Sequence, residues 1–344
     1  MESPDDDRRA STPSMDDVAR LAGVHQTTVS RALRNDPRIS RAVRERVEAA
    51  AAQLGYRPNP LLAALGTMRR RRATTAYQTP LAYIMRSGPA GAILDVHLAG
   101  ARRAAEQRGF RLEPFIMDDD LREGRLDRIL QARNIQGIIV GPLPEAHGNF
   151  TLDWSRFCTV VIEYSFTQPA FDRVVTDSYA TMNMAIAECR RRGFSRLGVV
   201  LAQVVDERNE GLLSAAYSLA REKDRRIAAI PRLILSGWQE DAMEGWIRRW
   251  EPEVIISSNT LLPFIQAYLQ RKRIRVPARV GLLNLNVDPS MNLSGICQDA
   301  PGIGAAAVRL VIEKLNHNDF GIPKSRVTLL TEGVWHEGKT LAKA

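Results

Sequence analysis

The sequence has little cysteine and no long apolar stretch. Its three cysteines, Cys158, Cys189 and Cys297, lie far apart and form no C-x-x-C pair, so free buried thiols are expected rather than a disulfide framework. No run approaches the roughly 20 apolar residues that span a membrane, and the first residues are acidic and polar, unlike a signal peptide. We therefore expect a cytoplasmic protein without a membrane partner.

The signatures of common enzyme classes are missing as well. The phosphate-binding patterns GxxxxGK[ST] and GxGxxG, the zinc pattern HExxH and the hydrolase pattern GxSxG do not occur, and the five histidines show no metal-ligand spacing. Asp118, Asp119 and Asp120 follow a predicted strand, but adjacent carboxylates point in different directions and repel each other, which favours a solvated loop over a metal site. The sequence predicts no cofactor, no metal and no catalytic residue.

Positive charge is present but unevenly distributed. The 344 residues contain 48 Lys and Arg against 39 Asp and Glu, a net charge of +9. Residues 15–72 hold 12 arginines, no lysine and only five acidic residues, so a net charge of +7 falls on about a sixth of the chain. Such a segment predicts a polyanionic partner.

Three short helical patterns follow one another inside this basic segment. They cover residues 16–22, 26–33 and 41–54, and in each the apolar residues recur at the i, i+3, i+4, i+7 spacing of a helix packed on a common core. Gly23 suits a tight turn between the first two helices, and Ser40 suits the N-cap of the third. The pattern predicts an all-α domain with a helix-turn-helix pair.

The segments on either side of these helices have a different character. Residues 1–14 are polar without periodicity, which predicts a disordered tail. Residues 59–68 predict one more short helix, capped by Asn59 and followed by four arginines at 69–72 that form either a solvated linker or a direct phosphate contact. The predicted domains are a tail (1–14), a helix-turn-helix domain (15–58), a hinge helix with a basic linker (59–78) and a core (79–344).

From about residue 79, short apolar runs alternate with amphipathic helices. Strands are predicted at residues 81–85, 112–117, 135–140, 160–162, 197–201, 254–257 and 280–285. Helices are predicted at residues 96–108, 179–192, 210–222, 240–249, 261–271 and 303–315. This alternation is typical of parallel α/β sheets, and seven strands suit two lobes better than one.

Four short segments carry the most specific signal in the chain. They are Asp17-Val18-Ala19, Ala22-Gly23-Val24, Thr28-Val29-Ser30-Arg31 and Leu54-Gly55-Tyr56-x-Pro58-Asn59. With these segments, residues 15–65 resemble the DNA-binding head of the lactose-repressor (LacI/GalR) family of bacterial transcription regulators. The resemblance implies a homodimer that places two recognition helices on a palindromic operator of double-stranded DNA.

The second predicted helix has the surface that such a head needs. Its apolar residues pack inward, which leaves Gln26, Thr27, Ser30 and Arg31 to face outward. The resemblance implies that Gln26 and Thr27 reach base edges in the major groove and that Arg31 contacts a base or the backbone. Gln can bind the N6 and N7 edge of adenine, and Arg can bind O6 and N7 of guanine, each at about 1–3 kcal/mol of discrimination. The resemblance implies phosphate contacts for Thr28, Ser30 and Tyr56.

The same resemblance implies a minor-groove hinge. In the family, the short helix after the head wedges a leucine between two base pairs, and Leu65 holds that position, with Asn59 and Leu62 beside the groove. An apolar wedge costs a few kcal/mol of unstacking, which contacts to bent DNA offset. Pro60 and Leu62 depart from the family pattern, and Leu61 and Leu62 have the alternative of packing between the two hinge helices of a dimer.

Residues 79–344 resemble, more diffusely, the periplasmic-binding-protein-like core of the family. That fold has two lobes, three crossovers between them and a small effector in the cleft. The crossovers are expected near residues 192, 297 and 325, which gives one lobe of 79–192 with 298–325 and another of 193–297 with 326–344. Ligands in open α/β sheets bind beyond the carboxyl ends of strands, so effector residues are expected there.

Three residues match effector-binding positions of the family. Arg208, in Arg208-x-x-Gly211, matches an arginine that binds the hydroxyls or carboxylate of the effector, both of which a guanidinium can hold. Asn259 matches the asparagine of an Asn-Asp motif, in which Thr260 replaces the Asp. Asn286 stands where the family has an acidic residue, and the loss of these two acidic groups favours a neutral or anionic effector.

Three further side chains complete the predicted cleft. Trp238 is a candidate stacking face for a sugar ring, and Asp177 and Gln298 are candidates near the cleft mouth and a crossover. The predicted effector is a small molecule of carbohydrate type, with the alternative that the cleft binds nothing.

Taken together, these features predict a sequence-specific transcriptional regulator, a repressor, that acts as a homodimer on nucleoid DNA and responds to a sugar or sugar derivative. A cytoplasmic solute-binding or sensory protein without enzymatic activity is the alternative; it explains residues 79–344 and leaves the head unexplained. A sugar-processing enzyme is a third hypothesis, which no residue supports.

Overall fold

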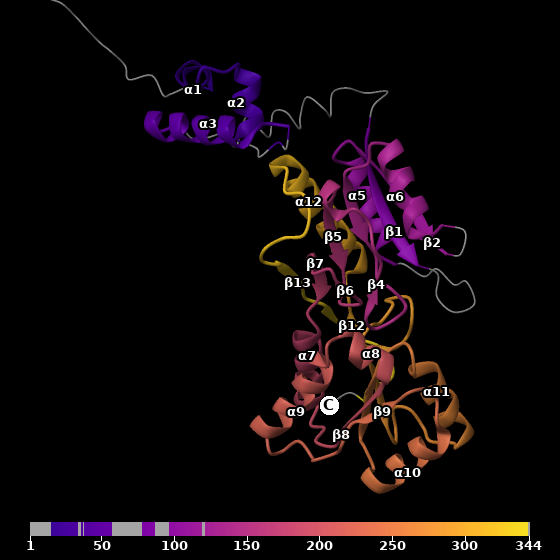
Figure 1. Ribbon diagram of the computed structural model, residues 1–344. Helices are drawn as coiled ribbons and strands as arrows, with labels where there is room; N and C mark the ends of the chain where they lie inside the picture. Colours follow the sequence, from indigo (N-terminus) through magenta and orange to yellow (C-terminus); the bar gives the residue numbers. More distant parts are fainter. Residues whose placement is uncertain are drawn as a thin grey trace, which may run out of the picture.

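The computed structural model describes residues 15–33, 36, 38–56, 78–86, 96–118 and 121–342 (Figure 1). The predicted tail, the hinge helix with Asn59, Leu62 and Leu65, and the arginines at 69–72 lie outside these residues. The described chain forms a helical head and an α/β core, which confirms the predicted fold class.

The head consists of α1 (Met15–Ala22), α2 (Gln26–Ala32) and α3 (Arg41–Leu54). Val18, Val29 and Val47, one from each helix, are fully buried in a common core. The backbone turns between α1 and α2 at Gly23 with φ +63°, a conformation that favours glycine. The Ser40 side chain accepts a hydrogen bond from the Val43 amide and caps α3, as the sequence predicts.

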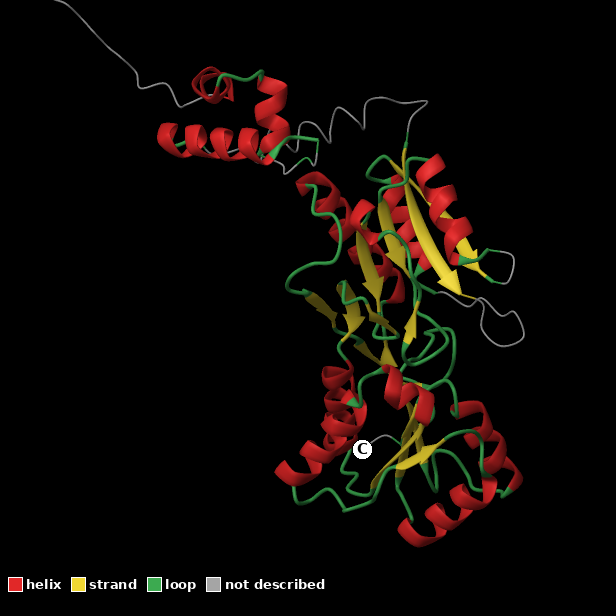
Figure 2. Cartoon of the chain, in the orientation of Figure 1, coloured by secondary structure: helices red, strands yellow, loops and turns green. Residues whose placement is uncertain are grey.

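The first lobe is built on a six-stranded sheet with the order β13-β7-β5-β3-β1-β2. Neighbouring strands in it are parallel. Its strands are β1 (Thr79–Arg86), β2 (Phe110–Met117), β3 (Gly137–Val140), β5 (Cys158–Ile162), β7 (Asp172–Thr176) and β13 (Thr328–Thr331). Its helices are α5 (Leu98–Glu106), α6 (Glu123–Ala132) and α12 (Ala300–His317). α5 and α12 cover one face and α6 the other, so the central strands β3, β5 and β7 are buried on both sides (Figure 2).

The second lobe has a sheet with the order β14-β12-β11-β10-β8-β9, parallel except for β14. Its strands are β8 (Leu197–Ala202), β9 (Leu233–Leu235), β10 (Val254–Ser257), β11 (Gly281–Asn284), β12 (Ser294–Cys297) and β14 (Val334–His336). Its helices are α7 (Ser178–Arg191), α8 (Gln203–Arg208), α9 (Leu212–Lys223), α10 (Glu240–Trp250) and α11 (Leu262–Arg271). Two short strands, β4 (Gly148–Asn149) and β6 (Phe166–Gln168), pair separately, and Trp154–Arg156 is a 3-10 turn.

Two of the predicted lobe boundaries are wrong. The apolar face of α7, including Met182 and Cys189, is buried in the core of the second lobe, so the first crossover follows Thr176 and not residue 192. β13 pairs with β7 in the first sheet, so the last crossover follows Thr331 and not residue 325. The two errors have related causes: neither an amphipathic helix nor a short edge strand at a boundary has a sequence mark for the lobe to which it belongs.

The two helices on one face of the first lobe cross at a pair of glycines. A Cβ atom on Gly100 would overlap the backbone of Pro301, and one on Gly304 would overlap the backbone of His97 and Ala101. The backbones of α5 and α12 therefore pack without intervening side chains, and this contact fixes His97 at the start of α5.

Candidate functional site

The recognition surface of the head lies on α2. Gln26, Thr27 and Arg31 are exposed, Thr28 and Ser30 are half-buried, and the apolar residues of the helix face the core. This exposure pattern matches the one predicted for base and phosphate contacts. The sequence alone did not single out His25, whose Nδ1 accepts a hydrogen bond from the Thr27 amide at 3.3 Å and caps the helix at the end that would face DNA.

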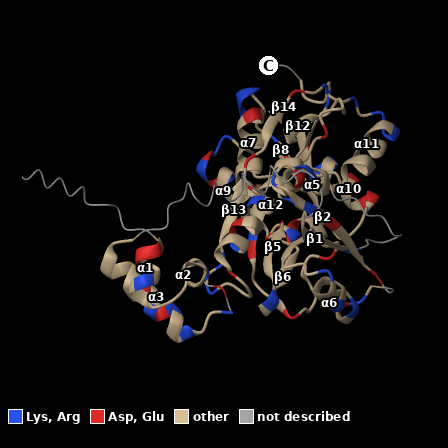
Figure 3. Cartoon of the chain, turned by 90° about the horizontal axis from the view of Figure 1, so that it is seen from above, with Lys and Arg blue, Asp and Glu red and all other residues tan. Residues whose placement is uncertain are grey.

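Acidic partners reduce the free positive charge of the head, as the interleaved basic and acidic residues along α3 show (Figure 3). Arg41 pairs with Glu45 one turn later at 2.7 Å. Arg38 donates through Nε and Nη2 to the carboxylate of Asp36, at 2.9 and 2.7 Å. Neither Asp36 nor Glu45 forms an ion pair with Arg31 in the described part of the head, so the Arg31 guanidinium is available to another partner.

Asp36 gives the head a dependence on pH. Hydrogen bonds from Arg38 lower the pKa of the buried Asp36 carboxyl from 3.8 to about 2. Because this pKa is lower in the folded state, the pair stabilises the head above about pH 4, and the stabilisation is lost as the pH falls towards 2. We predict that Asp36→Asn lowers the stability of the head by about 1 kcal/mol at neutral pH, since Arg38 is exposed and solvent screens the pair.

The measurement for Asp36→Asn is urea unfolding of parent and variant, followed by circular dichroism, at several values between pH 7 and pH 2. The difference between the two free energies of unfolding should shrink below pH 4. Other carboxylates with a low pKa, such as Glu188, are present in both proteins, so their titration does not contribute to this difference. A difference that stays constant down to pH 2 would contradict the prediction.

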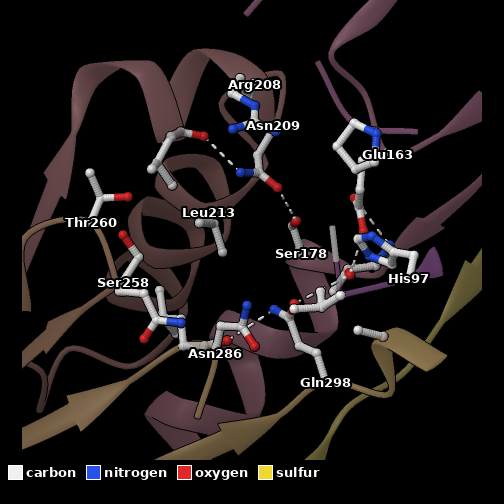
Figure 4. A pocket seen from close by; sticks show the side chains of 17 residues that line it. His97, Glu163, Ser178, Arg208, Asn209, Leu213, Ser258, Thr260, Asn286 and Gln298 are labelled. Atoms are coloured by element: carbon white, nitrogen blue, oxygen red, sulfur yellow. Dashed lines mark hydrogen bonds between the residues drawn. The ribbon is translucent and has the colours of Figure 1, made fainter. Parts of the chain in front are cut away.

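A cavity of about 270 Å³ lies between the lobes, at the carboxyl ends of strands from both sheets. Glu163 and Thr176 line it from the ends of β5 and β7 in the first lobe. Ser258 and Asn286, which follow β10 and β11, line it from the second lobe (Figure 4). This is the position at which open α/β sheets bind ligands.

Arg208 supplies an uncommitted cation to this cavity. It is the last residue of α8 and is half-buried, and its guanidinium forms no hydrogen bond or ion pair with any residue that the structure describes. Burial lowers the pKa of its guanidinium, while the carboxylates of Glu163 and Glu145 act in the opposite direction. A desolvated arginine without a partner is a binding group for a hydroxyl or a carboxylate.

An asparagine cluster arranges the polar groups of the second lobe. Asn284, which is 1% exposed, donates through Nδ2 to Asn259 Oδ1 at 2.5 Å and to the Asn286 carbonyl at 3.1 Å. Asn284 Oδ1 accepts from the Asn286 amide at 3.2 Å. Within the described chain, these bonds leave the Asn259 amide nitrogen and the Asn286 side chain without a partner, and the buried Ser258 hydroxyl also has none.

The wall formed by the first lobe contains a buried carboxyl. Glu163 accepts from the Thr176 amide at 3.2 Å and from its hydroxyl at 2.8 Å. Gln298 Oε1 lies 3.4 Å from the same hydroxyl, and its Nε2 donates to the Leu285 carbonyl at 2.9 Å. Burial raises the pKa of Glu163, and the nearby His97 partly offsets this effect.

Four of the six predicted effector residues line the cavity, and two do not. Arg208, Asn259, Asn286 and Gln298 are among the lining residues. The placement of Asp177 and Trp238 in the cavity is a wrong prediction. The Asp177 carboxylate caps α7 by accepting from the Ala180 amide at 2.7 Å. The Trp238 ring stacks on Phe264, with ring centroids 5.8 Å apart, in an apolar cluster of the second lobe.

Several lining residues were missed by the sequence analysis. They are His97, Glu163, Asn209 and Ser258. Glu163 directly follows the predicted strand at 160–162, so the rule that selected Asn259 after its strand could have selected Glu163 as well.

The described residues contain neither a metal-binding cluster nor a membrane-spanning helix. No group of three or more His, Cys, Asp or Glu side chains in this part of the chain is arranged to hold a metal ion. None of its helices combines the length and the apolar character needed to cross a membrane.

Family models match both parts of the chain. The model for bacterial regulatory proteins of the lacI family matches residues 14–59, and the model for the periplasmic binding protein-like domain matches residues 186–336. Residues 14–59 are thus a lacI-family domain. The residues that first indicated the family, from Asp17 to Asn59, lie within this match.

Named relatives agree with this assignment. The chain is 25% identical over 332 residues to the HTH-type transcriptional regulator PtxS of Pseudomonas plecoglossicida, with 92% of each chain covered. It is 46% identical over 54 residues, 16% of each chain, to the HTH-type transcriptional repressor CytR of Escherichia coli (strain K12).

Solved structures have the same fold. The transcriptional regulator CelR in complex with cellobiose gives a TM-score of 0.55 at 19% identity, covering 95% of this chain and 99% of CelR. The lac repressor dimer bound to operator and the anti-inducer ONPF gives 0.56 at 18% identity, covering 96% and 99%.

Proposed function

We propose that this regulator binds a palindromic DNA operator as a homodimer, and that a small polyhydroxylated effector in the cavity changes its affinity for that operator. The observation that carries the proposal is the joint presence of an exposed polar α2 surface and a cavity with unpaired polar groups. We place the protein in the cytoplasm, as a repressor on nucleoid DNA, with no catalytic step, cofactor or metal.

On the DNA side, Gln26, Thr27 and Arg31 are the proposed base contacts. Their exposure on one short helix suits insertion into the major groove. The proposed phosphate contacts are Thr28, Ser30 and Tyr56. The minor-groove roles of Asn59, Leu62 and Leu65 rest on the family resemblance. The lac repressor, a dimer bound to operator, has the same fold and supports the proposed assembly.

On the effector side, the polar groups without partners favour a sugar or sugar derivative. Hydroxyl groups both donate and accept, so they suit the combination of Arg208, Asn286 and Ser258. CelR, solved with cellobiose, supports a carbohydrate ligand. Arg208 is an unpaired cation, which favours a neutral or anionic effector over a cationic one.

The test of the DNA function is selection of bound duplexes from a random pool at about 0.15 M salt, where sequence-independent affinity is partly screened. The expected result is enrichment of a palindrome. A matched control chain that begins at residue 78 and lacks the head should enrich nothing. If the full chain enriched no sequence and still bound sugars, the solute-binding alternative would replace the proposal.

Arg208→Gln tests the effector site. Loss of one charge-assisted hydrogen bond should weaken binding of the preferred sugar about tenfold, because such bonds contribute about 1.5 kcal/mol or more. The measurement is titration calorimetry with glucose, gluconate, cellobiose and glucosamine. Arg225→Gln, at an exposed position of the same lobe, is the control and should bind as the parent does. Equal affinities for all three proteins would remove Arg208 from the site.

A further inference from the structure

The turn that carries Arg208 also joins the two lobes. Arg208 lines the cavity, Asn209 bonds to a residue of its own lobe, and Glu210 bonds to the first lobe. Asn209 Oδ1 accepts a hydrogen bond from Ser178 Oγ at 2.7 Å, next to the first crossover. Glu210 Oε1 accepts from Nη1 of Arg173 at 2.9 Å, and Arg173 belongs to β7 of the first sheet. One ion pair therefore runs from the first lobe to the second.

Arg173 is held firmly by the first lobe. The residue is 6% exposed, and its guanidinium lies 4.2 Å from the centroid of the Tyr164 ring. Its Nε donates to the Thr328 hydroxyl on the neighbouring strand at 3.2 Å. These contacts do not involve the second lobe, so the cation would keep its place if the lobes separated.

Glu210 is held by the backbone of the second lobe. It has φ +52°, and Gly211 follows with φ +69°, so two consecutive residues adopt the left-handed conformation. The Gly211 amide donates to the Asp206 carbonyl at 2.9 Å and closes the turn onto α8. The carboxylate of Glu210 and the guanidinium of Arg208 are thus attached to one rigid turn. A displacement of Glu210 would therefore also move Arg208.

The neighbouring ion pairs do not cross between lobes. Lys314 and Asp172, the residue before Arg173, pair at 2.6 Å inside the first lobe. Arg192 and Glu337 pair inside the second. The side chain of Glu210 is 45% exposed, so its attraction to Arg173 is modest and falls as salt rises. A contact of this strength can form and break during a regulatory cycle.

We propose that Arg173 and Glu210 form an interlobe clasp that favours the closed arrangement of the lobes and positions Arg208 over the cavity. This inference rests on the proposed function in one respect, because the effector would stabilise the same closed arrangement of the lobes. The clasp makes Glu210 a positioning residue, because it acts on the cavity through the turn and does not line it.

The test is Glu210→Gln in the full chain, without DNA and without effector. We expect a larger radius of gyration by small-angle X-ray scattering and about fivefold faster amide exchange at residues 208–212, the change expected for loss of one half-exposed ion pair. In 1 M salt the parent should approach the variant, and the variant should change little. Unchanged scattering and exchange in Glu210→Gln would overturn the proposal.

The matched control is Glu244→Gln. Glu244, whose side chain is 47% exposed and thus similar to that of Glu210, pairs with Lys272 at 2.8 Å, and both residues belong to the second lobe. This variant should keep the scattering and the exchange at residues 208–212 of the parent. Glu210→Arg, which places like charges together, should open the lobes further than Glu210→Gln, while an unchanged unfolding midpoint would show that the fold is intact. A regulator that bound no operator would refute the proposed function and leave these measurements valid.

Discussion

The Gly304→Val variant should be less stable than the parent chain by about 3 kcal/mol or more. A Cβ atom at position 304 would overlap the His97 carbonyl oxygen and lie 2.9 Å from the Ala101 amide nitrogen. Both are backbone atoms of α5, which cannot rotate away as a side chain would. α5 and α12 must therefore separate, and the apolar cluster that they cover would be exposed to water. The measurement is chemical denaturation followed by circular dichroism.

A second glycine provides the control for this prediction. Gly245, inside α10, has no atom within 4 Å of an added Cβ and does not have a positive φ. Gly245→Ala should raise stability by about 0.5–1 kcal/mol, because alanine loses less backbone entropy in a helix. Equal stability of the two variants would mean that α5 and α12 do not pack as closely as described.

The second large effect concerns sequence recognition. Arg31→Ala should reduce affinity for the selected operator by about a hundredfold, since each lost bidentate contact to guanine costs about 1–3 kcal/mol and a dimer loses two. Specificity should relax at one base position in each half-site. The measurement is fluorescence anisotropy with the operator and with single-base variants of it, at fixed salt.

Arg41→Ala is the control for Arg31. Arg41 is on α3, is strongly exposed and pairs with Glu45, so its loss should leave base preference unchanged. If Arg31→Ala weakened binding to every sequence equally, Arg31 would contact phosphate instead of a base.

The head was predictable because its elements are local. Each helix carries its own apolar spacing and its own boundary residues, such as Gly23 and Ser40, and the structure places all three helices within one residue of the predicted ends. The central strands of the core were predictable for a similar reason. β3, β8 and β10 are buried on both faces and therefore consist of continuous apolar runs.

The elements that were missed depend on distant partners. β7 contains Asp172 and Arg173, which are buried only because Lys314 and Glu210 neutralise them from far along the chain. β13 and β14 are short strands at sheet edges and have little apolar pattern.

The predicted residues of the candidate cavity divide in the same way, into those with a local signal in the sequence and those without one. Arg208, Asn259 and Asn286 were found because each matches a family position, and Gln298 was found because it lies near a predicted crossover. Trp238 was misplaced because its partner ring, Phe264, comes 26 positions later in the chain, and no local pattern predicts that stacking.

The order of the strands sets the order in which the parts of this protein can fold during synthesis. The head uses only residues 15–56 and can form early, since domains fold as units from the N-terminus. Neither lobe can be completed then, because α12 and the edge strands β13 and β14 come from the last 45 residues of the chain. At about 5–20 residues per second, tens of seconds pass between these events. On the ribosome, the part that contacts DNA is thus finished well before the part that would control it.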